Sequence, residues 1–151
     1  MTLVSYCWTL AVARAAKDGF RSGLEREVAA KLDKFGLEWE FEAWECDYVR
    51  RVPRGICVNP TCKATSVFSQ HRYTPDFSIV GKSYVIEVKG RLTSRDRTKL
   101  KAVQATGVEV RLIFRIDNKL YPRASTRYSD WCKREGFKYT FLNKLMKGWF
   151  K

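Results

Sequence analysis

Alternating apolar and polar positions predict a β-hairpin in residues 72–90, RYTPDFSIVGKSYVIEVKG. Two runs rich in β-branched and aromatic residues flank Gly81 and Lys82, an arrangement typical of two antiparallel strands joined by a tight turn. Successive side chains of a strand point to opposite faces. Glu87 and Lys89 therefore share one face of the second strand, and the opposite face is formed by Tyr84, Ile86 and Val88.

Apolar residues before the hairpin recur with the spacing of an α-helix. Apolar residues spaced four, four and three apart predict a helix that begins near Phe20 and stops at Gly36, with the stripe Leu24, Val28, Leu32 and Phe35. Ser22 and Glu25 have the S-x-x-E spacing of a capping box, in which two side chains bond backbone N–H groups of the first turn. Residues 37–41 then alternate as a strand, with one face formed by Glu38, Glu40 and Glu42.

The pattern after residue 90 predicts further α/β structure. Residues 92–106 indicate a helix with Ser94 at its N-cap, and residues 108–116 alternate as a strand. A short helix over residues 127–136 and a last strand over residues 137–141 follow. A helix between two strands is typical of a crossover that makes the strands parallel. We therefore predict an α/β fold with a mixed sheet flanked by helices.

Residues 46–71 are the least regular part of the chain. They contain three arginines, two prolines and the pair Cys57 and Cys62, so we predict a long, positively charged insertion loop. Together with Cys46 and His71, this pair has the composition of a four-ligand structural Zn²⁺ site. The alternative is unligated thiols in a surface loop, with His71 as a polar neighbour of the hairpin. We expect one domain over residues 20–151, preceded by an N-terminal extension of residues 1–19.

The charge of the chain limits its partners. It has 29 basic and 16 acidic side chains, a net charge of +13, and residues 51–151 carry 22 of the basic ones but only seven of the acidic ones. A body this basic predicts a polyanionic partner, most simply nucleic acid. An anionic membrane surface would also attract it, but the sequence has no basic amphipathic helix, no lipidation signal and no apolar run of transmembrane length.

The cysteines indicate a compartment. There are five, scattered along a chain that is long enough to bury a core without disulfide bonds, and this usage favours a reducing setting. Residues 4–16 faintly resemble a secretory signal peptide, but they lack a positively charged leading segment. We therefore expect a cytoplasmic protein, in the host cell if the source is viral.

Three ionisable residues of the hairpin suggest a catalytic site. Asp76 follows Pro75 and lies eleven residues before Glu87, so neighbouring strands can bring both carboxylates to one edge. Paired carboxylates suit Mg²⁺, which takes one or two of them together with water and phosphate oxygens. Lys89 beside them could orient or deprotonate an attacking water, or offset charge on the phosphate. The alternative is an Asp/Glu/Lys salt-bridge cluster at a sheet edge, but this combination on an apolar hairpin of a basic chain is the pattern of PD-(D/E)xK nucleases.

Longer motifs carry a more specific resemblance. The segments FRSGLE (residues 20–25), YTPDF (residues 73–77) and EVKG (residues 87–90) resemble the phage endonuclease I family, which resolves Holliday junctions. The likeness extends from Phe20 to Gly136. It implies a PD-(D/E)xK, restriction-endonuclease-like fold, divalent-metal hydrolysis of phosphodiesters and an intertwined homodimer that cuts branched DNA. Residues 46–71 are longer than the family pattern, and their cysteine pair is not part of it.

The resemblance also implies roles for individual residues. Asp76 and Glu87 would bind metal, Lys89 would assist the chemistry, and Glu25 would join the site from the partner subunit. Glu25 would also be a metal ligand, and Glu40, which matches a further acidic position of the family, could be one. From the residues alone the capping box explains Glu25, whereas the resemblance favours the site, and one residue could serve both.

We predict a structure-selective, Mg²⁺-dependent endodeoxyribonuclease that acts on branched double-stranded DNA as a homodimer, with Mn²⁺ able to substitute. Six basic residues are expected to contact DNA: Arg21, Arg91, Arg95, Arg97, Lys99 and Lys101. Two alternatives remain open. One is a sequence-specific endonuclease of the homing, restriction or transposon-end type, and the other is a non-catalytic DNA-binding protein with a nuclease-like fold.

Overall fold

A five-stranded mixed sheet forms the centre of the molecule. The computed structural model describes residues 19–53 and 66–151. The strands of this sheet are β1 (Trp39–Phe41), β4 (Phe77–Ile79), β5 (Tyr84–Lys89), β6 (Glu109–Phe114) and β7 (Lys138–Phe141), and they lie side by side in the order β1-β4-β5-β6-β7. The pairs β1·β4 and β4·β5 are antiparallel, and the pairs β5·β6 and β6·β7 are parallel. The expected mixed sheet is confirmed.

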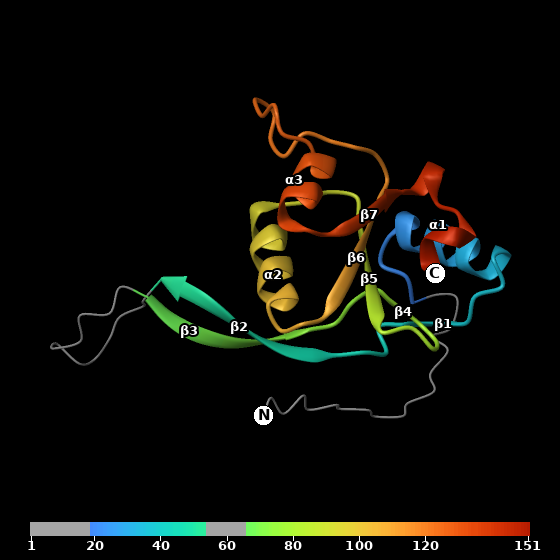
Figure 1. Cartoon of the computed structure of the whole chain (residues 1–151), viewed down its shortest axis with the longest axis horizontal. Helices are drawn as coiled ribbons and strands as arrows, with labels where there is room; N and C mark the ends of the chain where they lie inside the picture. Colours follow the sequence, from blue (N-terminus) through green and yellow to red (C-terminus); the bar gives the residue numbers. More distant parts are fainter. Residues whose placement is uncertain (1–18, 54–65) are drawn as a thin grey trace, which may run out of the picture.

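Helices cover both faces of this sheet (Figure 1). Helix α1 (Gly23–Lys34) packs on one face, where Val28 and Leu32 join Ile86 and Ile113 in one apolar core. Helices α2 (Ser94–Gln104) and α3 (Tyr128–Glu135) cover the other face, where the second core includes Leu100, Leu112 and Trp131. Two short 3₁₀ helices, Leu142–Lys144 and Lys147–Phe150, complete the α1 side.

The predicted faces of strand β5 are confirmed. Tyr84, Ile86 and Val88 belong to the core under α1, and Val85 belongs to the core under α2 and α3. The Glu87 side chain shares the face of Val85 because side chains alternate along the strand. The crossover through α2 makes β5 and β6 parallel and places Glu87 opposite Leu112.

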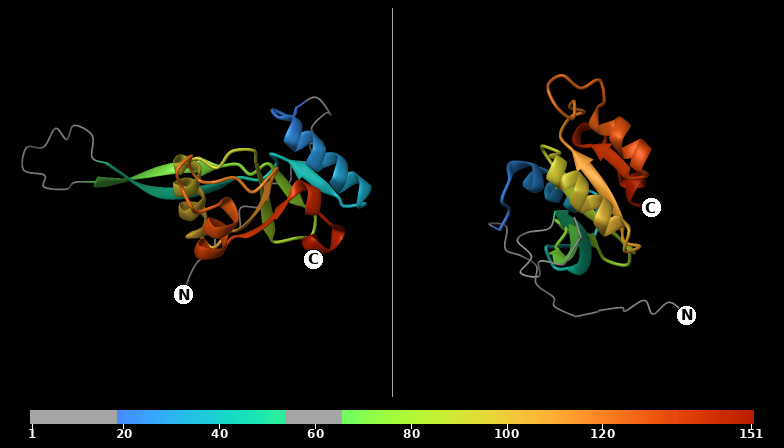
Figure 2. Two further views of the ribbon diagram at one scale, coloured as in Figure 1. Left: turned by 90° about the horizontal axis from the view of Figure 1, so that it is seen from above. Right: turned by 90° about the vertical axis from the view of Figure 1, so that its left-hand side faces the viewer.

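The predicted loop over residues 46–71 is wrong for its described part. Strands β2 (Cys46–Pro53) and β3 (Ser66–Tyr73) form a separate antiparallel ribbon, with Cys46 opposite Tyr73 and Pro53 opposite Ser66. The prolines and cysteines pointed to a loop, but Tyr48, Val49 and Val52 are residue types that favour strands, and Pro53 lies at the end of its strand, where proline is tolerated. The far end of the ribbon projects beyond α2 (Figure 2).

Helix caps largely follow the sequence. The Ser22 and Glu25 capping box begins α1, as predicted, and Gly136 ends α3 in the left-handed conformation with φ 78°. The prediction for α2 was wrong by one residue because Thr93, not Ser94, is the N-cap. A capping box needs an acceptor side chain three residues after the N-cap. Asp96 accepts the backbone N–H of Thr93, whereas the residue three after Ser94 is Arg97, whose side chain cannot accept a hydrogen bond.

Candidate active site

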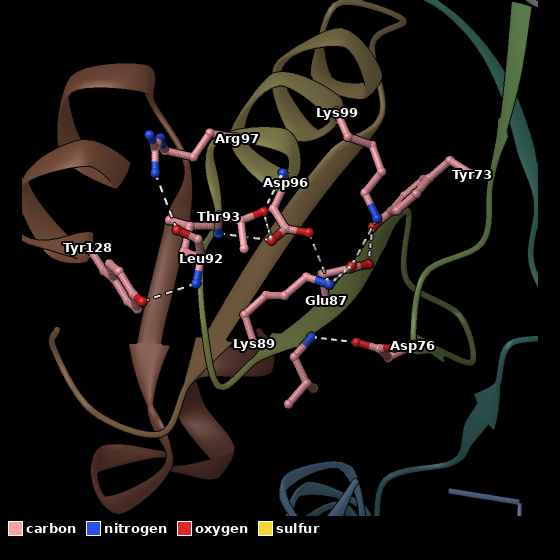
Figure 3. A network of polar contacts seen from close by, with 11 residues as sticks. Tyr73, Asp76, Glu87, Lys89, Leu92, Thr93, Asp96, Arg97, Lys99 and Tyr128 are labelled. Carbon is pink, nitrogen blue, oxygen red and sulfur yellow. Dashed lines mark hydrogen bonds and ion pairs between the residues drawn. The ribbon is translucent and has the colours of Figure 1, made fainter. Parts of the chain in front are cut away.

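The hairpin brings Asp76 and Glu87 together, as the sequence predicted. Asp76 lies immediately before β4, and its Oδ2 atom accepts a 2.7 Å hydrogen bond from the backbone N–H of Val88 on β5. The carbonyl oxygen of Asp76 accepts a 3.0 Å bond from the N–H of Glu42, just after β1. Asp76 is therefore fixed from both sides, by Glu42 after β1 and by Val88 near the C-terminal end of β5 (Figure 3).

Glu87 is buried and its carboxylate is fully engaged. Only 2% of the residue is exposed. Its Oε1 lies 2.8 Å from Nζ of Lys89 and 3.3 Å from Nζ of Lys99, and its Oε2 accepts a 2.7 Å hydrogen bond from the Tyr73 hydroxyl. A buried charge is tolerated when it is paired and hydrogen-bonded, and these three donors satisfy that condition.

The two carboxylates of the site repel each other. Burial and the neighbouring Glu87 carboxylate raise the pKa of Asp76 to about 7, although the hydrogen bond from Val88 and the charge of Lys89 both act to lower it. A pKa raised by desolvation and a like charge is typical of a functional site. A cation bound between the two carboxylates would reduce this repulsion and would favour the ionised form of Asp76.

Lys89 is an ammonium cation in this arrangement. Burial opposes its charge, but the carboxylates of Glu87, Asp96 and Asp76 together outweigh burial, and the pKa of Lys89 lies above its ordinary value. Its Nζ also lies 3.6 Å from Oδ1 of Asp96, at the start of α2. Burial acts to raise the pKa of Asp96, yet hydrogen bonds from Thr93 and the nearby lysines hold it below its ordinary value.

The chemistry of these donors fits a hard divalent cation. Within residues 19–53 and 66–151, no three His, Cys, Asp or Glu side chains are gathered as a ready-made metal cage. Mg²⁺ does not need one, because it commonly uses one or two carboxylates and completes its shell with water and substrate phosphate. Asp76 and Glu87 supply two carboxylates, so the residues present fit the ion.

Glu25 caps α1 and also lies near the site. Its Oε2 accepts the N–H groups of Arg21 at 2.8 Å and Ser22 at 3.3 Å, and the residue is buried. Within the same chain, its carboxylate is close enough to Asp76 to add to the raised pKa of Asp76. The two interpretations of Glu25 are therefore compatible with each other. Glu40 lies on β1 opposite Ser78, and the structure links it to neither Asp76 nor Glu87 by a hydrogen bond or ion pair.

The six basic residues expected at DNA are not equivalent. Lys99 lies against Glu87, Arg97 donates a 3.2 Å hydrogen bond to the carbonyl oxygen of Leu92, and Lys101 lies 3.0 Å from Oε2 of Glu135. The other three, Arg21, Arg91 and Arg95, are exposed. Arg21 also forms an ion pair with Glu42. Their contact with DNA stays a prediction.

Sequence reasoning missed three members of the site. Tyr73, Asp96 and Lys99 all join the network around Glu87, but none was assigned this role. The available signals were weak. Asp96 is three residues after Thr93, the spacing of a capping box, and Lys99 is one helical turn beyond Asp96.

The zinc hypothesis is only partly within the described residues. Cys46 and His71 lie on facing strands of the ribbon, whereas Cys57 and Cys62 lie outside the described residues. Burial and then the charge of Asp47 raise the pKa of the Cys46 thiol, which disfavours the thiolate that zinc requires. The zinc site stays a prediction.

Known proteins that resemble this chain are phage endonucleases. A model of the family described as phage endonuclease I matches residues 7–150 of the chain. Endodeoxyribonuclease 1 of Enterobacteria phage T3 is 35% identical over 130 residues, which cover 84% of this chain and 73% of that protein. Endonuclease I of Escherichia phage T7 is 34% identical over 136 residues, which cover 87% of this chain and 78% of that protein.

No helix in the described part of the chain is long and apolar enough to span a membrane.

Proposed function

We propose, from the premise that this chain belongs to the phage endonuclease I family, that it is a metal-dependent endonuclease which cuts branched DNA at four-way junctions. Family membership supports a nuclease that acts on DNA. The proposal adds the PD-(D/E)xK type of site, the divalent cation and the preference for a branched substrate.

One observation carries the proposal. Asp76 and Glu87 converge from adjacent strands, with the Lys89 ammonium 2.8 Å from Glu87, where the other residues of strand β5, Tyr84, Val85, Ile86 and Val88, are apolar and buried. A structural salt bridge does not explain why a second carboxylate lies beside Glu87 and has its pKa raised to about 7. The same pair is explained if a cation and a phosphate complete the site.

Each residue then has a defined task. Asp76 and Glu87 would hold Mg²⁺, or Mn²⁺ in its place, and the bound ion would supply Lewis-acid activation of water and phosphate. The Lys89 ammonium would orient the attacking water and offset negative charge that develops on the phosphate. Tyr73 keeps the Glu87 carboxylate oriented through its 2.7 Å hydrogen bond, and Glu25 adds an acidic group from α1.

Separation of cutting from binding tests the assignment of Lys89. Lys89→Ala should reduce junction cleavage by about 100-fold or more while junction binding remains, because general acid–base and charge-stabilising groups contribute at that scale. Lys82→Ala is the matched control, since Lys82 is exposed in the hairpin turn. Full cleavage by Lys89→Ala would contradict the proposal.

The β2–β3 ribbon supports the proposed homodimer. Phe68 is 76% exposed and Val49 is 54% exposed, and the register places both on the same face of the ribbon. An apolar face of this kind on a projecting ribbon suits contact with a second copy. In an intertwined dimer, the partner would present Glu25 at the position that α1 of the same chain occupies here.

The oligomeric state tests this part separately. The wild type should sediment as a dimer, and Phe68→Ser should shift it toward the monomer. Ser69→Ala, on the opposite face of the same strand, is the control substitution. A monomeric wild type would contradict the dimer but would leave the nuclease assignment standing.

A further inference from the structure

The buried carboxylate of Glu87 is shared by two lysines from different elements. Lys89 reaches Oε1 from β5 and Lys99 reaches the same atom from α2, at 2.8 Å and 3.3 Å. Oε2 is occupied by the Tyr73 hydroxyl. Figure 3 shows both ammonium groups converging on the carboxylate. Both ammonium groups therefore contact Oε1 of Glu87, a residue that the proposed function needs as a metal ligand.

The two lysines are held unequally. Lys89 also forms an ion pair with Asp96, whereas Glu87 is the single carboxylate in the described part of the chain with which Lys99 forms one. The second contact of Lys99 is the Tyr73 ring, with Nζ 5.1 Å from its centroid, which is weaker than an ion pair. The two side chains are similarly exposed, 26% for Lys99 and 22% for Lys89, so the lack of a second ion pair makes Lys99 the more easily displaced of the two.

A divalent cation competes with these lysines. Mg²⁺ binds carboxylate oxygens directly, and an ammonium group a few ångströms away repels it. A cation that takes Oε1 of Glu87 must therefore displace at least one lysine. Loss of Lys99 leaves Lys89 in place, still paired with Asp96, to act on the phosphate that the proposed function brings to the site.

We propose that Lys99 is a positioning residue that occupies the metal-binding oxygen of Glu87 in the metal-free protein and is displaced when a divalent cation binds. The inference rests on the metal-dependent function proposed above. Lys99 neutralises Glu87 until the ion arrives, and its displacement frees a positive charge for a DNA phosphate. Because one side chain serves both events, DNA and metal each strengthen the binding of the other.

Mn²⁺ binding to the full chain without DNA tests this inference, measured by isothermal titration calorimetry at neutral pH. Lys99→Gln removes the competing charge and should bind Mn²⁺ about tenfold more tightly than the wild type. Lys99→Arg keeps the charge and should restore wild-type affinity. Lys133→Gln, which removes an exposed charge on α3, is the control for net charge and should bind as the wild type does.

Unchanged or weaker Mn²⁺ binding by Lys99→Gln would overturn the inference. If that variant does not fold, Lys99→Met decides the question, because it removes the charge but keeps an aliphatic stem against Tyr73. Failure of the proposed function is recognised independently. If Asp76→Ala binds Mn²⁺ as tightly as the wild type, the two carboxylates are not the metal site, and the inference falls with it.

Discussion

Tyr73 donates a 2.7 Å hydrogen bond from its hydroxyl to Oε2 of Glu87, and both side chains are almost completely buried. The bond joins the end of the β2–β3 ribbon to the middle of the central sheet. Burial and then the Glu87 carboxylate raise the pKa of Tyr73 well above its ordinary value, so the hydroxyl remains a donor. It fixes which oxygen of Glu87 faces Lys89 and Lys99.

Removal of this hydroxyl should be costly. In Tyr73→Phe, a buried carboxylate loses a donor, so the free energy of unfolding should fall by about 1–3 kcal/mol, measured by urea denaturation. Junction cleavage should fall as well, because Glu87 is no longer oriented. Tyr139→Phe is the control, since Tyr139 contacts Phe141 through its ring. Equal stability of Tyr73→Phe and the wild type would show that the hydrogen bond does not hold Glu87.

The raised pKa of Asp76 predicts a pH dependence of stability. Between its ordinary pKa and about 7, Asp76 binds a proton more strongly in the folded than in the unfolded chain. The free energy of unfolding should therefore decrease as pH rises through this window and level off above about 7. Asp76→Asn should remove this loss, because its amide stays neutral while its oxygen can still accept the N–H of Val88.

Urea denaturation in EDTA at pH 5 and pH 8 measures the effect without metal. The wild type should lose more unfolding free energy between the two pH values than Asp76→Asn, by about 1–3 kcal/mol. The same loss in both proteins would mean that Asp76 is not desolvated as described.

Two substitutions at Glu25 separate its cap from its chemistry. Glu25→Gln keeps an oxygen acceptor for the N–H groups of Arg21 and Ser22, so stability should stay near that of the wild type. Glu25→Ala loses the acceptor and should cost about 0.5–2 kcal/mol of unfolding free energy. Cleavage should fall by about tenfold or more in both, if the charge serves the site. Full cleavage by Glu25→Gln would make Glu25 a cap alone.

Local patterns predicted much of the fold. The alternation around Glu87, the helical stripe ending at Phe35 and the capping box of Ser22 each depend on neighbouring residues, and each is confirmed. The paired carboxylates were also predictable, because a short turn fixes which strand ends meet. The ribbon of residues 46–53 and 66–73 was missed because its two strands, CDYVRRVP and SVFSQHRY, do not alternate apolar and polar residues, and the nearby prolines and cysteines favoured a loop.

The rest of the site depends on contacts between distant elements. Lys99 belongs to a helix whose basic residues look alike in the sequence, and only packing of α2 beside β5 directs this one lysine to Glu87 rather than to solvent. Tyr73 was visible in a motif, but its partner is fourteen residues away on a strand of another sheet. The hydrophobic periodicity of a sequence does not predict such contacts between side chains of separate elements.

Cleavage of an immobile four-way junction, beside a linear duplex of the same sequence, tests the central claim most directly. The assay compares the wild type with Asp76→Ala, each with Mg²⁺ and with EDTA. Paired cuts near the branch point, made by the wild type with Mg²⁺ and absent in the other three reactions, are the predicted result. Cutting of the linear duplex at one sequence, or tight junction binding without any cutting, would contradict a junction-resolving nuclease.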